Sequence, residues 1–381
     1  MANARLMNSP EDYTRLGVKK DKIEVWEESR RSDTNSGSWE WWYFDAILND
    51  GIAVVIQFFT KKRKGLNSSI PQPYGTFKIT MPSGEHYERT VESPPKTGSF
   101  GKDKCDVHIG AHKFIGDLKN YQLYVDETNG LGADLSLTSR TQPFRPGTAY
   151  FGFGDKDEQY YTWLCAVPSG DVSGTLTING KKIEVSGKGY HDHQWGTIGI
   201  MEAWNHWVWA RQRFDDYTIL VFDMTTRKEF GYKRFPICFI QDKNGNIIFE
   251  NTDNVSSKVL EEYHDPKSGK DYPKTMHYAF SNNGKTVNYT LSFTNILEEK
   301  SVNSLKLIFQ RKLGKVLTFS IGELLMKIQI KKFRKKGLMP SYARYLAEGK
   351  LEIVYGDTNI KRSGELIYEF MYPGLSYKGH L

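Results

Sequence analysis

Residues 39–45 read WEWWYFD, and this stretch carries the clearest structural signal in the sequence. It places three of the nine tryptophans of the chain within four residues, beside two carboxylates. Because alternate side chains of a β-strand point to opposite faces, one face carries Trp39, Trp41, Tyr43 and Asp45, and the other carries Glu40, Trp42 and Phe44. Indole rings favour burial, and buried ionisable groups need partners. The stretch therefore predicts a strand with polar groups set among aromatic rings.

A second stretch, at residues 190–196, reads YHDHQWG and repeats the combination. The same alternation places His191, His193 and Trp195 on one face, and Tyr190, Asp192 and Gln194 on the other. Two such stretches predict an apolar cavity into which a few polar groups point, which is the composition of a ligand site. We expect an enzyme or a binding protein for a large apolar molecule.

Most of the remaining chain has the pattern of short strands separated by turns. Asp50-Gly51 and Asn179-Gly180 predict hairpin turns, because glycine adopts a positive φ without steric cost. The expected strands are residues 39–47, 52–59, 74–80, 105–109, 113–115, 121–126, 132–138, 162–167, 172–178, 181–185, 203–211, 217–224, 234–241, 246–250, 276–280, 287–295, 350–355 and 364–371. This pattern predicts an all-β fold of antiparallel barrels or sandwiches.

The length of 381 residues exceeds what one hydrophobic core usually supports. We therefore expect two β-domains of similar size, residues 1–198 and 199–381, with the boundary near Gly196 and Gly199.

Composition excludes several classes of protein. The net charge of +7 is mild for this length, and no RNA-binding aromatic motif accompanies it, so no nucleic-acid partner is expected. The three cysteines are far apart and odd in number, which favours free thiols in a reducing compartment. Neither a signal peptide nor an apolar stretch of about 18 residues is evident. We expect a cytoplasmic protein of unknown oligomeric state.

One segment departs from the β pattern. Between Ile321 and Lys336, apolar residues recur at helical spacing and are followed by the basic run KKFRKK at residues 331–336. This predicts a short amphipathic helix in the C-terminal half. The helix either caps a barrel with its basic end in water or docks on an anionic membrane.

The chemistry that these residues favour is general acid catalysis. His191 and His193 could offer two metal ligands, but a third would have to come from His206 or a carboxylate elsewhere, and no metal site is expected. Nucleophile elbows and phosphate loops are missing, and no cofactor is expected. A carboxyl group in an aromatic pocket has a raised pKa and can protonate a double bond. The candidates are Asp223, Asp192, Glu40 and Asp45, with His193 as a proton partner.

The alternative is structural. Glu40 would then pair with an arginine such as Arg211, and His191 and Asp192 would tie the two domains together by buried hydrogen bonds.

The strings EWWYF (residues 40–44) and HDHQWG (residues 191–196) resemble the two signatures of the AttH/CrtC lipocalin-like superfamily. This group includes carotenoid 1,2-hydratases, kievitone hydratase and lipocalin-like Diels–Alderases. The resemblance extends from Trp39 to the closing GELIYEF at residues 364–370. It implies two lipocalin-like β-barrels with a substrate pocket and no cofactor.

In the carotenoid hydratases, a His and a Trp of the second signature and a downstream Asp act on a terminal double bond. His193, Trp195 and Asp223 match these places, whereas Val221 stands where a tyrosine is expected. The first hypothesis is therefore acid-initiated hydration or cyclisation of an isoprenoid or polyene, with Asp223 as proton donor. The substrate-binding residues would be Trp41, Tyr43, His191, Trp195, Trp207, Trp209 and Tyr217.

Two other hypotheses remain open. The first is a pericyclase that folds a linear polyene for cycloaddition and needs no single acid. The second is a carrier that binds a lipid without chemistry.

Overall fold

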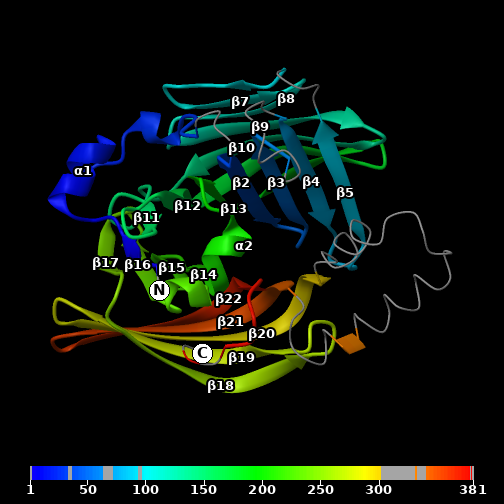
Figure 1. Cartoon of the computed structure of the whole chain (residues 1–381). Helices are drawn as coiled ribbons and strands as arrows, with labels where there is room; N and C mark the ends of the chain where they lie inside the picture. Colours follow the sequence, from blue (N-terminus) through cyan, green and yellow to red (C-terminus); the bar gives the residue numbers. More distant parts are fainter. Residues whose placement is uncertain are drawn as a thin grey trace. The chain divides into compact units, whose positions relative to one another are not determined.

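The computed structural model describes residues 2–32, 37–62, 72–92, 97–301, 331–332, 340–377 and 379. These residues form two antiparallel β-sheets, each of them curled, with short helices in the first 28 residues and at residues 200–203 (Figure 1). The all-β fold class that the sequence predicted is confirmed.

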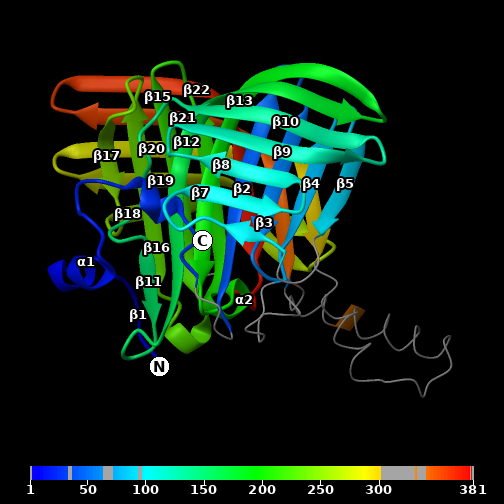
Figure 2. The same ribbon diagram turned by 90° about the horizontal axis from the view of Figure 1, so that it is seen from above.

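Within the described residues, the first sheet contains thirteen strands and runs in the order β5-β4-β3-β2-β13-β12-β10-β9-β8-β7-β6, with β11 beside β12 and β1 beside β11. Strands β2, β13 and β12 lie side by side in its middle (Figure 2). The strands are β1 (Ala4–Leu6), β2 (Trp39–Leu48), β3 (Ala53–Phe59), β4 (Tyr74–Thr80), β5 (His86–Glu92), β6 (Ser99–Phe100), β7 (Cys105–Ile109), β8 (His112–Gly116), β9 (Asn120–Thr128), β10 (Leu131–Ser139), β11 (Tyr150–Phe153), β12 (Gln159–Ile178) and β13 (Lys181–Gly196).

The second sheet has nine strands among the described residues, in the order β17-β16-β15-β14-β22-β21-β20-β19-β18. The strands are β14 (Trp204–Arg213), β15 (Tyr217–Thr226), β16 (Arg234–Asp242), β17 (Ile247–Asn251), β18 (Val255–Asp265), β19 (Lys270–Asn282), β20 (Lys285–Ser301), β21 (Ser341–Tyr355) and β22 (Thr358–Tyr372).

The chain divides into two compact units. The first contains Met1–Ile200 and Gln241–Ile247, and the second contains Met201–Ile240 and Ile248–Leu381. The assignment of residues 1–198 and 199–381 to separate domains stays a prediction.

Each sheet buries one face of its strands in its own hydrophobic core. In the first unit, that face includes Trp42, Phe44, Phe58 and Phe114. In the second unit, Met276, Tyr278, Tyr289 and Tyr368 are among the core residues. Apolar and polar residues alternate in β4 and β10, as expected for strands with one buried face. All three cysteines are buried, and none of them forms a disulfide.

Each expected strand overlaps an observed one, although Ile52, Ala203 and Asn246 lie outside the observed strands, and the sequence pattern underestimated several lengths. The expected pair 162–167 and 172–178 is one long strand, β12, whose register shifts near Val167. β5 and β18 were not predicted, because they expose most of their side chains and contain few apolar residues.

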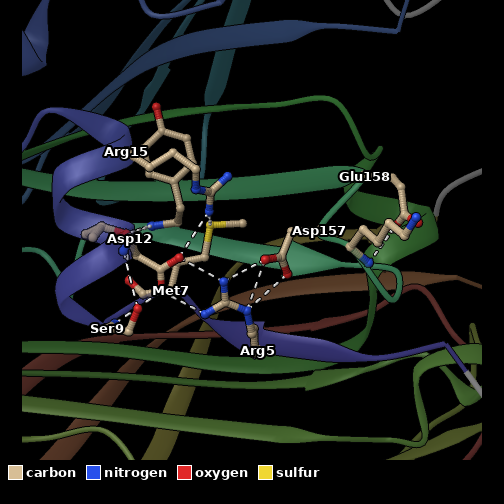
Figure 3. Close-up of polar contacts among 10 residues, drawn as sticks. Arg5, Met7, Ser9, Asp12, Arg15, Asp157 and Glu158 are labelled. Atoms are coloured by element: carbon tan, nitrogen blue, oxygen red, sulfur yellow. Dashed lines mark hydrogen bonds and ion pairs between the residues drawn. The ribbon is translucent and has the colours of Figure 1, made fainter.

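The N-terminal segment was not predicted either. It contains α1 (Pro10–Leu16) and the 3₁₀ helix η1 (Val25–Glu28). Arg5 lies between two carboxylates, 2.7 Å from Asp12 and 2.6 Å from Asp157, and Ser9 caps the helix (Figure 3). These contacts attach α1 to the first sheet through the β1–β11 pair.

The other helices are α2 (Ile200–Ala203) and η3 (Lys228–Phe230). The expected amphipathic helix lies outside the described residues, except for Lys331 and Lys332. Among the described residues, no helix is both long and apolar enough to cross a bilayer.

A substitution at Gly174 in β12 would test how closely the strands of the first sheet pack. Its φ is +140°, and a Cβ added there would lie 2.1 Å from the carbonyl oxygen of Asp134 in β10. We expect Gly174→Ala to lower the free energy of unfolding by about 3 kcal/mol or more, measured by urea denaturation. The matched control is Gly180→Ala, at φ +76° with no atom within 4 Å, which should cost about 1 kcal/mol. Equal effects of the two changes would contradict this packing.

Candidate active site

The two aromatic stretches quoted from the sequence are direct neighbours in the first sheet. β2 pairs antiparallel with β13 so that residues 39–45 lie opposite residues 196–190, with Tyr43 facing Asp192 and Trp42 facing His193. Cross-strand partners share a face of the sheet. The two faces predicted for each stretch therefore merge into two continuous surfaces. We call the one that contacts the core the inner face and the opposite one the outer face.

The inner face holds a buried polar network centred on Glu28, the last residue of η1. Glu28 Oε2 lies 2.7 Å from His191 Nε2 and accepts a hydrogen bond of 2.7 Å from the Tyr121 hydroxyl. Its other oxygen, Oε1, lies 3.2 Å from His193 Nδ1, close enough for an ion pair but without good hydrogen-bond alignment. One carboxylate thus bridges the two histidines of the second stretch.

Glu40 completes this network from the other side of His193. Its Oε1 lies 2.8 Å from His193 Nε2, and its carboxylate accepts hydrogen bonds from the backbone of Arg31 and Ser32 and from the Ser32 hydroxyl. Under the structural hypothesis, Glu40 was expected to pair with an arginine such as Arg211. The observed side-chain partners are instead His193 and Ser32. The indole of Trp42 stacks on the His193 ring at 4.6 Å.

Burial and charge act against each other in this network. Burial raises the pKa of Glu28, but the charge and hydrogen bond of His191 and the close contact with His193 outweigh this effect and hold the pKa at about 2. Burial lowers the pKa of His193, but the close contact with Glu28 and the hydrogen bond to Glu40 outweigh that effect and raise the pKa above 6.5. The network therefore favours a charged Glu28–His193 pair inside the core.

Three groups of the inner face are close enough to be considered as metal ligands. Atoms of Glu28, Cys105 and His191 lie within 4.8 Å of one another. However, burial raises the pKa of the Cys105 thiol well above its usual value, and this thiol donates to the carbonyl of Phe114. Glu28 Oε2 already accepts from Tyr121 and contacts His191. These contacts fit a hydrogen-bonded network with a protonated cysteine.

The outer face holds Asp192 among donors from its own strand and from β12. Its Oδ2 accepts hydrogen bonds from the Tyr190 hydroxyl at 2.8 Å and from Trp163 Nε1 at 3.1 Å. Gln194 Nε2 lies within 3.2 Å of both carboxyl oxygens. Burial raises the pKa of Asp192 to about 6, against the lowering effect of the bonds from Tyr190 and Gln194. Asp192 therefore has a raised pKa, which is the property that we predicted for a general acid.

Aromatic rings surround Asp192 on this face. Trp41 and Tyr43 are half-buried, Trp41 stacks on Trp39 at 4.7 Å, and Tyr43 contacts Tyr190 at 6.2 Å. The Tyr43 hydroxyl also donates to Asp45. Half-buried aromatic rings beside a buried carboxyl form a surface on which an apolar molecule can lie.

Trp195, expected to bind substrate, lies on the inner face with His193 and donates through Nε1 to the Tyr150 hydroxyl. It lines a cavity of about 10 Å³ together with Glu27 and Arg145. That volume is below the roughly 300–1,000 Å³ of ligand pockets. A larger hollow, in the second unit, has a polar lining that includes His277, Lys350, Glu352 and Lys361. Neither matches the large apolar cavity that the sequence predicted.

Asp223, the predicted proton donor, lies in the second unit. It pairs with the guanidinium of Arg234, a contact that was not predicted from the sequence. Arg234 donates to both of its oxygens, at 2.8 and 2.6 Å, and the Tyr278 hydroxyl donates to Oδ2 at 3.0 Å. Bidentate hydrogen bonds from a guanidinium are typical of a carboxylate. This environment differs from the apolar pocket that the prediction assumed.

The other predicted residues of the second unit do not surround Asp223. Asp223 pairs with Val208, whereas Trp207 and Trp209 pair with Met224 and Phe222, so both tryptophans lie on the opposite face of the sheet. Tyr217 contacts the guanidinium of Arg362. The predicted set of Asp223, Trp207 and Trp209 is therefore not one site. His193 belongs to the first unit, and its predicted partnership with Asp223 stays a prediction.

Sequence reasoning missed Glu28, Arg234 and Trp163. Glu28 lies in the sequence VWEES at residues 25–29, which carries no motif. Trp163 lies on a predicted strand, and side-chain alternation assigns it to one face of that strand. The order of the strands in the sheet is needed to show that Asp192 lies on the same face.

Glu28→Gln tests the charged pair of the inner face. Glu28 stabilises the fold above its ordinary pKa of 4.5 and loses this contribution as pH falls toward 2, whereas His193 contributes below 6.5 and loses its part as pH rises past its raised pKa. Both are fully present between about pH 4.5 and 6.5. There we expect Glu28→Gln to cost about 3 kcal/mol in urea unfolding.

At pH 3 the difference between Glu28→Gln and wild type should shrink. The control is Glu184→Gln, an exposed position of the same β13 strand, which should be neutral at both pH values. A difference that stays constant with pH would contradict the charged pair.

Curated proteins that are similar to this chain include the following three. The chain is 27% identical over 208 residues to a hydroxyneurosporene dehydrogenase of Chlorobaculum tepidum, covering 46% of this chain and 53% of that protein. It is 26% identical over 245 residues to a quinolone epoxide rearrangement protein of Penicillium thymicola, covering 59% and 65%. It is 22% identical over 233 residues to a hexane cyclase of Penicillium citrinum, covering 56% and 53%. The matches thus span about half to two thirds of these relatives.

Crystal structures share the fold at low identity. An AttH protein of Nitrosomonas europaea has a TM-score of 0.57 at 14% identity, covering 93% of this chain and 97% of that one. CghA with Sch210972 has a TM-score of 0.60 at 12% identity, covering 93% and 96%. Kievitone hydratase from Nectria haematococca has a TM-score of 0.52 at 14% identity, covering 97% of each chain. The lipocalin-like fold class implied by the resemblance is confirmed.

A family model described as AttH-like matches residues 33–298, which is more than half of the 381 residues and includes both aromatic stretches. The chain therefore belongs to the AttH-like family.

Proposed function

We propose that this protein is a cofactor-independent enzyme that acts on a large apolar isoprenoid or polyene by acid-initiated hydration or cyclisation. Asp192 is the general acid. The observation that carries the proposal is the buried Asp192 carboxyl, whose pKa is raised to about 6, beside the half-buried rings of Trp41 and Tyr43. A carboxylic acid of this kind is partly protonated near neutral pH and can deliver a proton.

The relatives support a substrate of this class. The curated relatives include a hydroxyneurosporene dehydrogenase, a quinolone epoxide rearrangement protein and a hexane cyclase, and a kievitone hydratase shares the fold. We extend to this chain a large, mostly apolar organic substrate. The reaction type follows from the acid and the aromatic rings of the outer face.

In the proposed step, an alkene of the substrate takes the proton of Asp192. The π electrons form the new C–H bond, the electron pair of the O–H bond stays on Asp192, and a carbocation remains on the substrate. The faces of Trp41 and Tyr43 stabilise this cation. Water then captures the cation, and its surplus proton returns to the Asp192 carboxylate, which gives hydration and restores the acid. Alternatively, a second alkene of the same molecule captures it before proton loss, which gives cyclisation.

Asp223 and His193 remain predicted participants with weaker support. Arg234 occupies both oxygens of Asp223, and both ring nitrogens of His193 face carboxylates, Glu28 and Glu40. These contacts favour structural roles, because bidentate hydrogen bonds from a guanidinium are typical of a carboxylate, and the ring of His193 is held between two carboxylates.

The first test is turnover of a panel of linear polyene isoprenoids, followed by liquid chromatography and mass spectrometry. A product heavier by one water supports hydration, and a product of unchanged mass with a new retention time supports cyclisation. We expect Asp192→Asn to lower kcat by about a hundredfold or more, because it removes the proton. The control is Glu184→Gln on the same strand, which should keep wild-type activity.

Other outcomes separate the rival functions. Full activity of Asp192→Asn would reject the acid mechanism and favour a pericyclase, in which positioning suffices. Binding of polyenes without any product would favour a carrier.

The pH dependence gives an independent check. Since the protonated form of Asp192 is the active one, kcat/KM should fall as pH rises through about 6. A rate that rises with pH over this range would contradict Asp192 as an acid.

A further inference from the structure

We propose that Asp192 carries its proton on Oδ1, and that Tyr190, Trp163 and Gln194 are positioning residues that assign the proton to this oxygen. The inference rests on the proposed function, since it specifies which atom of the general acid delivers the proton.

The two oxygens of Asp192 have unequal hydrogen-bond partners. Oδ2 accepts from three donors: the Tyr190 hydroxyl at 2.8 Å, Trp163 Nε1 at 3.1 Å and Gln194 Nε2 at 3.2 Å. Oδ1 accepts only from Gln194 Nε2, at 3.1 Å, among the residues that the structure describes. An indole N–H can only donate, so Trp163 cannot accept a proton from Oδ2. The lone pairs of Oδ2 are therefore occupied, and Oδ1 is the oxygen with room for the proton.

Gln194 is itself held in one orientation. The Tyr161 hydroxyl lies 2.7 Å from Gln194 Oε1 and donates to it. This contact leaves the amide NH₂ group facing Asp192, which is the orientation that a carboxylate favours. Since the NH₂ group spans both oxygens, it fixes the rotation of the carboxyl about its Cβ–Cγ bond.

The position of the proton determines which oxygen of Asp192 delivers it to the substrate. With Oδ2 as the carbonyl oxygen, the O–H bond lies at Oδ1, the oxygen that accepts fewer hydrogen bonds from described residues. The three donors also stabilise the ionised carboxylate left after proton transfer, so they assist the step that forms the carbocation. A proton on Oδ2 would instead displace one of these donors.

Infrared difference spectroscopy of the full-length protein tests the position of the proton without a substrate. The carbonyl stretch of protonated Asp192, assigned by its loss in Asp192→Asn, moves to lower frequency when the carbonyl oxygen accepts hydrogen bonds. If Oδ2 is the carbonyl oxygen, Tyr190→Phe and Trp163→Phe should each move the band to higher frequency. The matched control is Gln122→Leu, which removes an exposed glutamine–aspartate contact with Asp134 and should leave the band unchanged.

A band that moves in Gln194→Leu but not in Tyr190→Phe or Trp163→Phe would place the proton on Oδ2 and overturn the inference. Two aromatic variants are used so that misfolding of one does not decide the result. If no polyene is turned over by wild-type protein, the proposed function fails, while the band shifts still decide where the proton lies.

With a turned-over substrate, Gln194→Leu gives a second readout. At low pH, where Asp192 is protonated in every variant, we expect kcat to fall by about tenfold with little change in KM, because the acid is present but no longer oriented. Tyr190→Phe should shift the pH profile upward, since the Tyr190 hydrogen bond lowers the pKa of Asp192. An unchanged kcat in Gln194→Leu would overturn the positioning role of this residue.

Discussion

The antiparallel pairing of β2 with β13 is the constraint on which the rest of the first unit depends. It places residues 39–45 opposite residues 190–196 without a register shift. A slip of one residue would move every side chain of one strand to the other face. Glu40 would then lose His193, and Asp192 would turn toward the core. The pairing of β2 with β13 thus places the charged network of Glu28, Glu40 and the histidines on one face and the candidate acid Asp192 on the other.

The two faces of this ladder use the same residue types for different purposes. On the inner face, Glu28 and Glu40 meet histidines, so opposite charges compensate burial. On the outer face, Asp192 meets only neutral donors, from a tyrosine, an indole and an amide. Neutral donors only partly offset the cost of burying a charge, and its pKa stays raised. The absence of a cation among the hydrogen-bond donors to Asp192, within the described residues, is what makes it a candidate acid.

The same reasoning explains why Asp223 became a weaker candidate. The sequence shows an aspartate on an apolar strand, TILVFDM at residues 218–224, and an apolar strand predicts an apolar surrounding. Arg234 comes from the next strand of the sheet, β16, eleven residues later in the chain. Strand periodicity assigns a face to Asp223, but it does not say which side chain of a neighbouring strand meets it there.

Side-chain alternation and turn residues act over short distances along the chain, so the amino-acid sequence was sufficient to predict the all-β class, the position of most strands and the two faces of each aromatic stretch. The folded sheet was needed to show that the two stretches pair with each other and that Glu28, from a segment without a motif, lies between His191 and His193. It was also needed to show that Trp163 and Tyr190 donate hydrogen bonds to Asp192. These contacts join residues up to 165 positions apart. They depend on strand order, burial and charge compensation in the folded sheet, which no local pattern encodes.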